Sequence, residues 1–565
     1  MLSIRKIGII GRTYRHITRY RQILAVFFRY GFGEFVELFK IEQYLEIGLQ
    51  VISRKQREQT EHLTRAERVR MAFEELGPTF IKFGQVLSTQ PGLIPIDIVN
   101  ELSKLQDDVP SSPFEPIREV IENELGQPAG EVFKTIDPTP IASASIAQVY
   151  AATLHSGEKT ALKIRRPGIR NTIEIDLEIM LYLAGLMERH IEEFASHRPT
   201  EIVEEFARVL EKELDFTIEA TNMERFARQF SDDDTIYTPR VYRDYTTPRM
   251  LVLEYIDGIK ISDIQALEEE GYDKKLITQR GTDATLKQVF IHGFFHGDPH
   301  PGNVFILPGN VICIIDFGMV GNVNLKYQEM FVDLLDCLVH QDAVGTTKVL
   351  LQLTIWDDEP VSTVLERDVT DFIGQHLYKP LKEMELGKIL QNLLEMLHRH
   401  RLRIPPNIFL MIKAIATIEN TARQMDPEFN IITYATPFLK KVKLARYTPW
   451  RVAGDIIKTA SELSHFTRQF PADLLEISRL LKNEKITVNI EHKGIAPLIA
   501  TYDQVSNRLA FAIIIAALLI GSAMIITTEI PPLVFGISLL GIIGFAGAAL
   551  MGMWLLVAIL RKGRL

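Results

Sequence analysis

The sequence is poor in cysteine, with only Cys313 and Cys337 among 565 residues. Two cysteines cannot build a disulfide framework, so the chain is typical of a reducing compartment. Its histidines and cysteines form no cluster with the spacing of a zinc site. The net charge of −9 argues against a nucleic-acid-binding protein, which needs a basic surface. The chain is also too long for one compact core, so we expect several domains.

Acidic residues are absent before Glu34, where basic residues are frequent. A signal peptide is not indicated there, because the apolar run 23–28 is too short. Three interpretations stay open: a basic helix resting on an anionic membrane, a basic helix packed on its own domain, and an arginine-rich mitochondrial presequence. The third is the least favoured, because recognisable structure starts at once. The basic residues are Arg5, Lys6, Arg12, Arg15, Arg19, Arg21 and Arg29.

Charge is also absent from two apolar runs near the C-terminus, 509–527 and 533–560. A bilayer core of roughly 30 Å needs about 20 apolar residues in a helix, and both runs are long enough. Arg508 precedes the first run and Arg561 follows the second. The positive-inside rule therefore predicts a membrane hairpin whose two ends, with the large N-terminal part, lie in the cytoplasm.

The rest of the chain mixes helical and strand-like patterns. Helical spacing dominates up to about residue 125, with a break at Gly77-Pro78. Two β-like segments, 149–152 and 160–164, flank a turn that contains Gly157. The pattern further predicts helices over 171–194 and 199–229, strands over 250–255, 304–306 and 311–315, and mainly helices from there to about 490.

Two motifs in order point to phosphoryl transfer. Asp298 and Asn303 lie in the sequence His-Gly-Asp-Pro-His-Pro-Gly-Asn, and Asp316 begins Asp-Phe-Gly at the end of an apolar strand. Carboxylates and amides hold Mg²⁺ on a triphosphate, and a further carboxylate lies near the attacking group. Asp-x4-Asn followed by a strand that ends in Asp-Phe-Gly is the way in which kinases supply them.

Lys163 lies on the second strand of the predicted hairpin, where its side chain can reach the α- and β-phosphates of a nucleotide. A solvated strand lysine is the alternative, and the later motif favours the nucleotide role. Such a lysine needs a carboxylate partner from a following helix. Glu213, Asp215 and Glu219 are candidates, and only Asp215 and Glu219 can share one face of a regular helix.

Glycine is lacking at the place where a kinase has its phosphate-covering loop. Alanine lets the backbone come close but restricts φ compared with glycine, so we expect this loop to hold nucleotide differently. Glu254 lies near the end of the predicted strand 250–255, at a hinge where backbone groups would meet adenine. The candidate nucleotide contacts in the loop are Ala142, Ser143, Ala144, Ser145 and Ala147.

These residues together resemble the UbiB-like atypical kinases, protein-kinase-like proteins linked to ubiquinone biosynthesis. Lys82-Phe83-Gly84-Gln85 is similar to that family's KxGQ motif, and Glu213-Leu214-Asp215 is similar to its ExD motif. Residues 142–148 resemble its alanine-rich loop, and the C-terminal hydrophobic pair is similar to that of bacterial members. The resemblance covers nearly the whole chain.

The resemblance implies an α+β, two-lobed protein-kinase-like fold with a helical N-terminal extension and a C-terminal transmembrane hairpin. It implies that Lys163 pairs with Glu213, with Glu219 as a less favoured alternative. The domains expected are a basic helical region (1–60), a KxGQ extension (61–125), an N-lobe (126–255), a C-lobe (256–490), a linker (491–507) and two transmembrane helices (508–561). The further roles expected are Lys82 and Gln85 in the active site, Asp298 as catalytic-loop carboxylate, Asn303 and Asp316 as Mg²⁺ ligands, and Glu213, Asp215 and Glu254 as ATP contacts.

The resemblance also implies a function. Because the KxGQ helices would occupy the place of a peptide substrate, we expect ATP hydrolysis or transfer to a small or lipid-like acceptor. The His-Gly-Asp triplet is also similar to that of aminoglycoside and choline kinases, which keeps a small-molecule acceptor open. The expected setting is the bacterial inner membrane, with the lipid bilayer, isoprenoid quinone precursors and other quinone-biosynthesis enzymes as partners.

Two other functions stay open. A nucleotide-gated lipid-binding or scaffold pseudokinase with little chemistry is motivated by the alanine-rich loop and the covering helix. A true protein kinase is disfavoured by the KxGQ motif and because no Ala-Pro-Glu follows Asp316.

Overall fold

The computed structural model forms two compact units, Met1–Val452 and Ala453–Leu565. The described residues are 14–32, 62–88, 94–105, 110–190, 198–356, 360–377, 385–446, 448–450, 495–528, 531–534 and 537–561, with isolated positions between 453 and 475. Most of the predicted basic region 1–60 lies outside them. Each unit is described below by itself.

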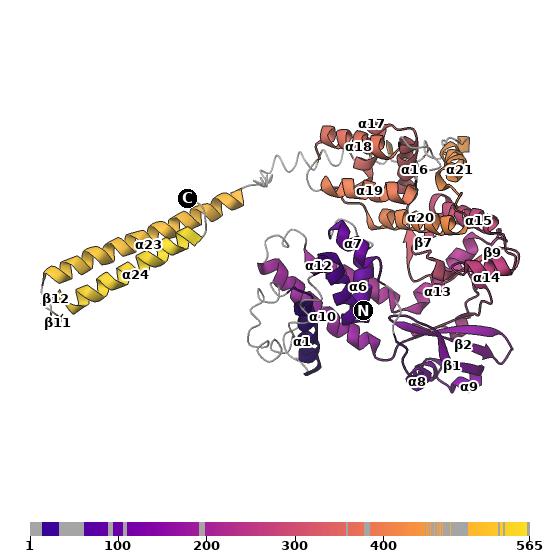
Figure 1. The fold of residues 1–565 in the computed structure, drawn as a ribbon, viewed down its shortest axis with the longest axis horizontal. Coiled ribbons are helices and arrows are strands. Elements are labelled where there is room, and N and C mark those ends of the chain that lie inside the picture. Colours follow the sequence, from indigo (N-terminus) through magenta and orange to yellow (C-terminus); the bar gives the residue numbers. More distant parts are fainter. Residues whose placement is uncertain are drawn as a thin grey trace. The chain divides into compact units, whose positions relative to one another are not determined.

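The first unit begins with helices (Figure 1) whose buried side chains belong to the same hydrophobic core as those of the kinase-like lobes. Helix α5 (Arg65–Leu76) starts with a capping box between Thr64 and Glu67 and stops at Gly77, whose φ is 92°. Helix α6 (Pro78–Ser88) carries the KxGQ motif, and α7 (Ile96–Leu102) follows. A Cβ at Gly84 would overlap Leu105, so this glycine permits the close packing of α6.

Helix α1 (Tyr14–Arg29) is the described part of the basic N-terminal segment. Its apolar side chains Ile23 and Val26 are buried in the same core as α5. Arg19 donates to Asp176 of α10 (Ile169–His190) at 2.6 Å and to the carbonyl of Leu76 at 2.7 Å. These contacts favour the interpretation of a basic helix packed on its own domain.

The N-lobe is a four-stranded antiparallel sheet in the order β1-β2-β3-β5, with α8 (Phe114–Leu125) and α9 (Ala129–Val132) beside it (Figure 1). Its strands are β1 (Phe133–Ser143), β2 (Ala147–Leu154), β3 (Lys159–Arg165) and β5 (Met250–Glu254). The predicted hairpin is therefore confirmed as β2-β3. One face of the sheet packs on α8 through a core that includes Tyr150, Leu162 and Val252.

The region predicted as one helix over 199–229 is two helices, α12 (Pro199–Glu213) and α13 (Phe216–Gln229). Asp215 causes the break, because its side chain accepts a hydrogen bond from the Thr217 amide and caps α13. The change of direction at Leu214 gives Glu213 and Glu219 different surroundings.

The C-lobe contains a small sheet in the order β4-β9-β8-β6 and a helical bundle. The strands are β4 (Ile236–Tyr237), β6 (Ile259–Lys260), β8 (Val304–Leu307) and β9 (Val311–Ile314), and β7 (Phe294–His296) pairs separately with β10 (Val320–Asn322). The helices are α14 (Ile264–Glu269), α15 (Lys274–Lys287), α16 (Leu325–Val339), α17 (Ala343–Leu353), α18 (Ser362–His376), α19 (Leu386–Arg399), α20 (Pro406–Met425) and α21 (Ile431–Ala445).

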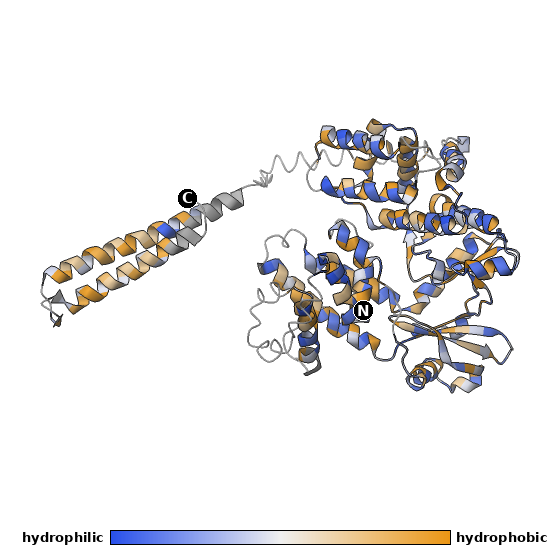
Figure 2. Cartoon of the chain, in the orientation of Figure 1, coloured by the Kyte–Doolittle hydropathy of each residue, from blue (hydrophilic) through white to orange (hydrophobic). Residues whose placement is uncertain are grey.

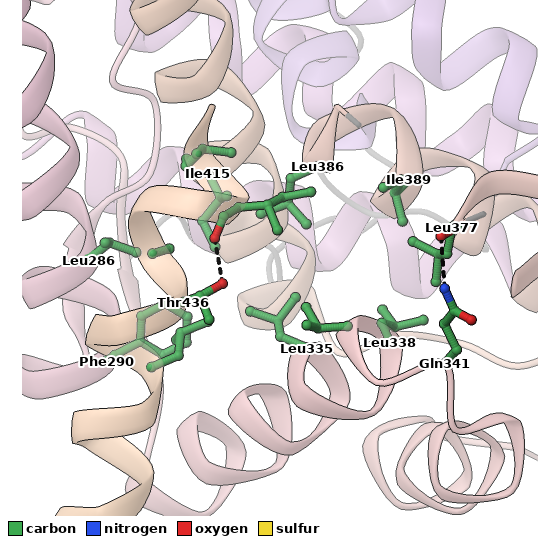
Figure 3. A pocket seen from close by; sticks show the side chains of 15 residues that line it. Leu286, Phe290, Leu335, Leu338, Gln341, Leu377, Leu386, Ile389, Ile415 and Thr436 are labelled. Carbon is green, nitrogen blue, oxygen red and sulfur yellow. Dashed lines mark hydrogen bonds between the residues drawn. The ribbon is translucent and has the colours of Figure 1, made fainter. Parts of the chain in front are cut away.

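Helices of the C-lobe enclose an apolar cavity of about 270 Å³ (Figure 3). Both polar side chains labelled there form hydrogen bonds within the bundle. Gln341 donates to the Leu377 carbonyl at 3.0 Å, and the Thr436 hydroxyl donates to the Ile432 carbonyl at 2.6 Å. None of the predicted site residues lines this cavity. It belongs to the packing of the bundle and not to the nucleotide site.

The second unit is a pair of long helices, α23 (Ile495–Thr527) and α24 (Leu539–Arg561). Apolar residues cover both (Figure 2), and the windows Val505–Thr527 and Leu539–Leu556 are long and apolar enough to cross a membrane. The second helix begins at Leu539 and not at 533, because β11 (Leu533–Val534) and β12 (Ile537–Ser538) form a short hairpin before it. Helix α23 also takes in most of the segment predicted as a linker.

Candidate active site

Strand pairing in the C-lobe brings Asn303 and Asp316 together. Val304 of β8 is paired with Ile314 of β9, and the Ile315 amide donates to the Asn303 carbonyl at 2.9 Å. Asn303 and Asp316 therefore leave the same end of one hairpin. Asp316 has a φ of 59°, in the left-handed region that non-glycine residues rarely adopt, as expected where a functional site holds a strained backbone.

His296 joins the two motifs through its ring. Its Nε2 lies 2.7 Å from the Asp316 carbonyl oxygen, and the Asp298 amide donates to its Nδ1 at 3.2 Å. A carbonyl can only accept, so Nε2 carries the proton and the ring is neutral. Burial lowers the pKa of His296, which favours the same neutral form. The imidazole thus fixes the backbone of Asp298 relative to that of Asp316.

Lys163 pairs with Glu219 and not with Glu213, so the favoured expectation is wrong. Its Nζ lies 2.8 and 2.9 Å from the two carboxylate oxygens of Glu219 and 3.3 Å from Asp316 Oδ1. Glu219 lies in the first turn of α13, whereas Glu213 is the last residue of α12. The break between these helices gives the kinase-like pairing to Glu219.

The charged side chains of Lys163, Glu219 and Asp316 shift one another's pKa values. Loss of hydration lowers the pKa of Lys163, but Asp316 and Glu219 raise it by more, so the ammonium stays charged. The Lys163 charge holds the pKa of Asp316 well below its usual range, although loss of hydration opposes this. Burial raises the pKa of Glu219 against the lowering by Lys163, and Asp316 adds to the rise. Asp316 is thus the carboxylate that is most strongly held ionised.

The KxGQ helix supplies a second lysine to the same region. Lys82 Nζ lies 3.4 Å from Glu213 Oε2, and the Lys82 charge contributes to lowering the pKa of Asp316. Gln85 instead donates to the Leu105 carbonyl at 3.2 Å, within the extension. The structure thus brings Lys82 toward the centre and shows Gln85 bonded within its own segment.

Two other predicted contacts have structural partners. Asp215 caps α13 through Thr217, at 3.0 Å to the amide. The Glu254 carboxylate accepts from the Tyr237 hydroxyl at 2.6 Å and from the Arg240 amide at 3.1 Å. Their roles toward a nucleotide stay predictions.

The alanine-rich loop between β1 and β2 is held by Arg166. The guanidinium donates to the Ala144 carbonyl at 2.9 Å, to the Ser143 hydroxyl at 2.7 Å and to the Pro110 carbonyl at 2.9 Å. The buried Ser145 hydroxyl has no hydrogen-bond partner among the described residues. The loop is therefore an arginine-anchored turn with one unsatisfied donor.

The donors at this centre fit Mg·ATP. Mg²⁺ is bound in proteins by one or two side-chain oxygens and completed by substrate phosphates. Asp316 and Asn303 supply such oxygens from one end of a hairpin, and Lys163 supplies a cation for phosphate. Within the described ranges, no three His, Cys, Asp or Glu side chains gather as a metal cluster of their own.

Sequence reasoning missed three residues that the fold brings to this region. Arg166 anchors the loop, His296 joins the two motifs, and Lys413 of α20 lies 3.3 Å from Asp298 Oδ1. Arg166 follows Lys163 closely and His296 is part of the motif, so their positions carried a signal. Nothing local in the sequence connects Lys413 with Asp298.

Comparisons with known families and proteins agree with this geometry. The model of the ABC1 atypical kinase-like domain matches residues 104–350, that of the UbiB helical domain residues 369–430, and that of the ABC1/UbiB kinase-like C-terminal domain residues 493–561. These matches cover the kinase-like lobes, part of the helical bundle and the apolar hairpin.

Curated proteins are similar over most of the chain. "Probable protein kinase UbiB" of Marinobacter nauticus is 34% identical over 459 residues, 80% of this chain and 83% of that protein. The protein of that name from Pseudomonas putida (strain W619) is 36% identical over 73% of this chain and 77% of its own length. "Uncharacterized protein in hydrogenase 1 5'region" of Clostridium pasteurianum is 33% identical over 88% of this chain and 94% of its own length.

A solved structure titled "The complex structure of Rv3197-erythromycin from Mycobacterium tuberculosis" is 22% identical. The match covers 62% of this chain and 90% of the chain in that structure. Its TM-score is 0.45, so the similarity is too distant to bear on function.

Proposed function

The chain belongs to the ABC1/UbiB atypical kinase-like family, and from that premise we propose that it is an ATP-dependent phosphoryl-transfer enzyme. It binds Mg·ATP and transfers the γ-phosphoryl group to water or to a small or lipid-like acceptor. It works at the bacterial inner membrane and supports the synthesis of ubiquinone or a related isoprenoid quinone, by making lipid precursors accessible to other enzymes of that synthesis.

One observation carries the proposal: Lys163, Asp316 and the Asp298 loop form one connected centre. Lys163 contacts Asp316 at 3.3 Å, and His296 ties the Asp316 backbone to that of Asp298. When bound, Mg²⁺ supplies charge neutralisation between the phosphates. Asp316 and Asn303 hold the metal, Lys163 binds phosphate oxygens, and Asp298 accepts the proton of the attacking hydroxyl or water.

The N-terminal extension supports an acceptor other than a protein. Lys82 of α6 reaches Glu213 at the end of α12, so a helix from outside the kinase-like lobes reaches the region next to the centre. The close packing of α6 on Leu105 at Gly84 makes this helix part of a buried core. A long peptide substrate would compete with this element, whereas water or a small head group would not.

The apolar helices support work at a membrane. Both windows in α23 and α24 can cross a bilayer by length and composition. Quinone precursors with long isoprenoid tails stay in the bilayer, so an enzyme that serves them must act at its surface.

A second candidate is a nucleotide-gated scaffold with little chemistry. The observation that favours it is the glycine-free loop, which Arg166 anchors through Ala144 and Ser143. A loop held in this way closes less freely over phosphates than a glycine-rich loop does.

The two candidates are separated by phosphate release from the full-length chain in lipid vesicles with Mg²⁺ and ATP. The enzyme predicts turnover that is lost in Asp316→Asn and kept in Asp244→Asn, an exposed carboxylate with none of the contacts of the site. Mg·ATP binding without turnover, even with membranes, would refute the enzyme and leave the scaffold.

Cells test the biological role. A strain that lacks this chain should accumulate quinone intermediates, and the wild type but not Asp316→Asn should restore quinone. Deletion after residue 505 should weaken quinone production while the remaining part still binds ATP. Unchanged quinone levels in that deletion would make the anchor incidental.

A further inference from the structure

The catalytic loop itself contains no permanently charged cation that could neutralise a transferred phosphoryl group. Residues 296–303 include neither lysine nor arginine. Among the described residues, Lys413 of α20 forms an ion pair with Asp298, and its Nζ lies 3.3 Å from Asp298 Oδ1. A helix far along the chain thus supplies what the loop lacks.

The fold places Lys413 there through the packing of α20 on the loop. A Cβ at Gly297 would lie 2.8 Å from Leu410 Cδ2, so only glycine lets the helix approach this closely. Leu410 and Lys413 are three residues apart and share one helix face. The Gly297 amide donates to the Met319 carbonyl at 2.9 Å, which fixes the loop on its other side. Lys413 is therefore held beside Asp298 by the core on both sides.

The Lys413–Asp298 pair stays open to solvent. The exposed fractions of the side chains are 26% for Lys413 and 35% for Asp298. A pair this exposed contributes little to stability, and its lysine can exchange one oxygen partner for another at small cost. The geometry therefore suits a lysine that can turn from a carboxylate to a phosphate.

We infer that Lys413 is a catalytic residue that binds the oxygens of the γ-phosphoryl group during transfer, in the role that a loop lysine or an arginine finger has elsewhere. This inference rests on the proposed phosphoryl transfer. For hydrolysis, the water oxygen bonds to the γ-phosphorus while the bond from phosphorus to the β–γ bridging oxygen breaks. The water proton passes to Asp298, and ADP leaves with the bridging oxygen. Lys413 neutralises charge on the equatorial oxygens, which is greatest in the transition state.

A purely positioning role is the alternative, in which Lys413 only orients Asp298. A positioning role needs only a hydrogen-bond donor at residue 413, whereas the catalytic role also needs a positive charge. In Lys413→Gln the side chain can still donate a hydrogen bond to Asp298, but it carries no charge for phosphate. Lys413→Arg keeps the charge. A positioning role predicts that Gln retains activity, whereas the catalytic role predicts that Arg retains it better.

The experiment compares these variants in the full-length chain in vesicles, by phosphate release and by binding of ADP with and without aluminium fluoride, which mimics the transferred group. We expect Lys413→Gln to lower kcat and the affinity for ADP–aluminium fluoride by about 100-fold each, because one transition-state charge contact is lost. The affinity for ADP alone should change by less than about threefold, since Lys413 contacts only the γ-phosphoryl group.

Lys388→Gln is the matched control, since it breaks a 2.7 Å pair with Glu385 on a surface where the lysine is 73% exposed. The inference is overturned if Lys413→Gln keeps both quantities within about threefold of the wild type, or if Lys413→Gln is more active than Lys413→Arg. Absence of turnover in the wild type would instead refute the proposed enzyme, and the ATP-to-ADP affinity ratio of Lys413→Gln would then still test the contact. Equal melting temperatures of the Lys413 and Lys388 variants establish that folding is not the cause.

Discussion

Two lysine–glutamate pairs lie near Asp316, and they are built differently. Lys163 contacts both oxygens of Glu219 at 2.8 and 2.9 Å, within the kinase-like lobe. Lys82 comes from the N-terminal extension and approaches one oxygen of Glu213 at 3.4 Å. The two glutamates are close in sequence, yet they serve different lysines because the chain bends between α12 and α13.

One of these pairs lies inside the kinase-like lobe, and the other connects the N-terminal extension to it. The Lys163–Glu219 pair is tight, is 17% and 6% exposed, and joins strand β3 to helix α13, as a nucleotide site needs. The longer Lys82–Glu213 pair fastens a separate helix onto the end of α12. The first pair therefore lies within the kinase-like lobe, and the second joins the extension to that lobe.

The largest effect should come from removing the cation of the tight pair. Lys163→Met leaves the buried Glu219 carboxylate without a counter-charge, so the free energy of unfolding should fall by about 3–5 kcal/mol. Urea denaturation of the variant measures this. Lys163→Met/Glu219→Gln should recover part of the loss, because only the half-exposed Asp316 carboxylate is then left without the lysine. A single variant as stable as the wild type would show that the centre does not depend on this pair.

The next effect concerns Arg166, which connects the two regions. Its guanidinium donates both to the Pro110 carbonyl, within the extension, and to the Ala144 carbonyl of the loop. Arg166→Lys cannot reach all these acceptors, and we expect a loss of about 2–3 kcal/mol from the carbonyls left unpaired. Hydrogen exchange should increase together in 110–112 and 144–147. Arg170→Lys, which touches only the exposed Glu174, is the control. Faster exchange in only one segment would contradict a shared anchor.

A smaller effect is expected at the looser pair. Lys82→Ala should cost about 1–2 kcal/mol and increase hydrogen exchange in α6 without altering α13, because the pair is 13% and 12% exposed but its contact is longer than that of Lys163 with Glu219. A double-mutant cycle with Glu213→Ala should give a coupling energy of about 0.5–1 kcal/mol. Coupling as large as that of Lys163 with Glu219 would remove the distinction between the two regions.

The smallest effect is at an ion pair outside both regions. Burial raises the pKa of Asp233, but hydrogen bonds from Lys287 and Thr235 outweigh it and leave the pKa below its ordinary value. A carboxyl whose pKa is lower in the folded than in the unfolded state stabilises the protein at pH values above the unfolded-state pKa. This stabilisation is lost as the pH falls through the folded-state pKa. Asp233→Asn should therefore cost a few tenths of a kcal/mol to about 1 kcal/mol at neutral pH and less near pH 3, measured by denaturation across pH. An equal cost at both pH values would argue against a charge effect.

Much of the centre was predictable because it is local in the chain. Asn303 directly precedes β8, and Asp316 follows β9 after one residue. Because β8 and β9 form one short hairpin, the spacing of the two residues in the sequence alone predicts that they lie close together. Lys163 was placed on its strand for the same reason. The partner of Lys163 was predicted wrongly, because a single-residue cap at Asp215 decides where α12 stops.

The sequence by itself determined which residues make up the candidate active site, the apolar hairpin and the glycine-free loop, since each depends on the order and type of neighbouring residues. Tertiary structure decided that Glu219 receives Lys163, that Arg166 anchors the loop and that Lys413 meets Asp298. These contacts join elements 56, 22 and 115 residues apart. Only the packing of helices against sheet and loop brings these groups into contact, and no local sequence pattern predicts a contact between residues so far apart in the chain.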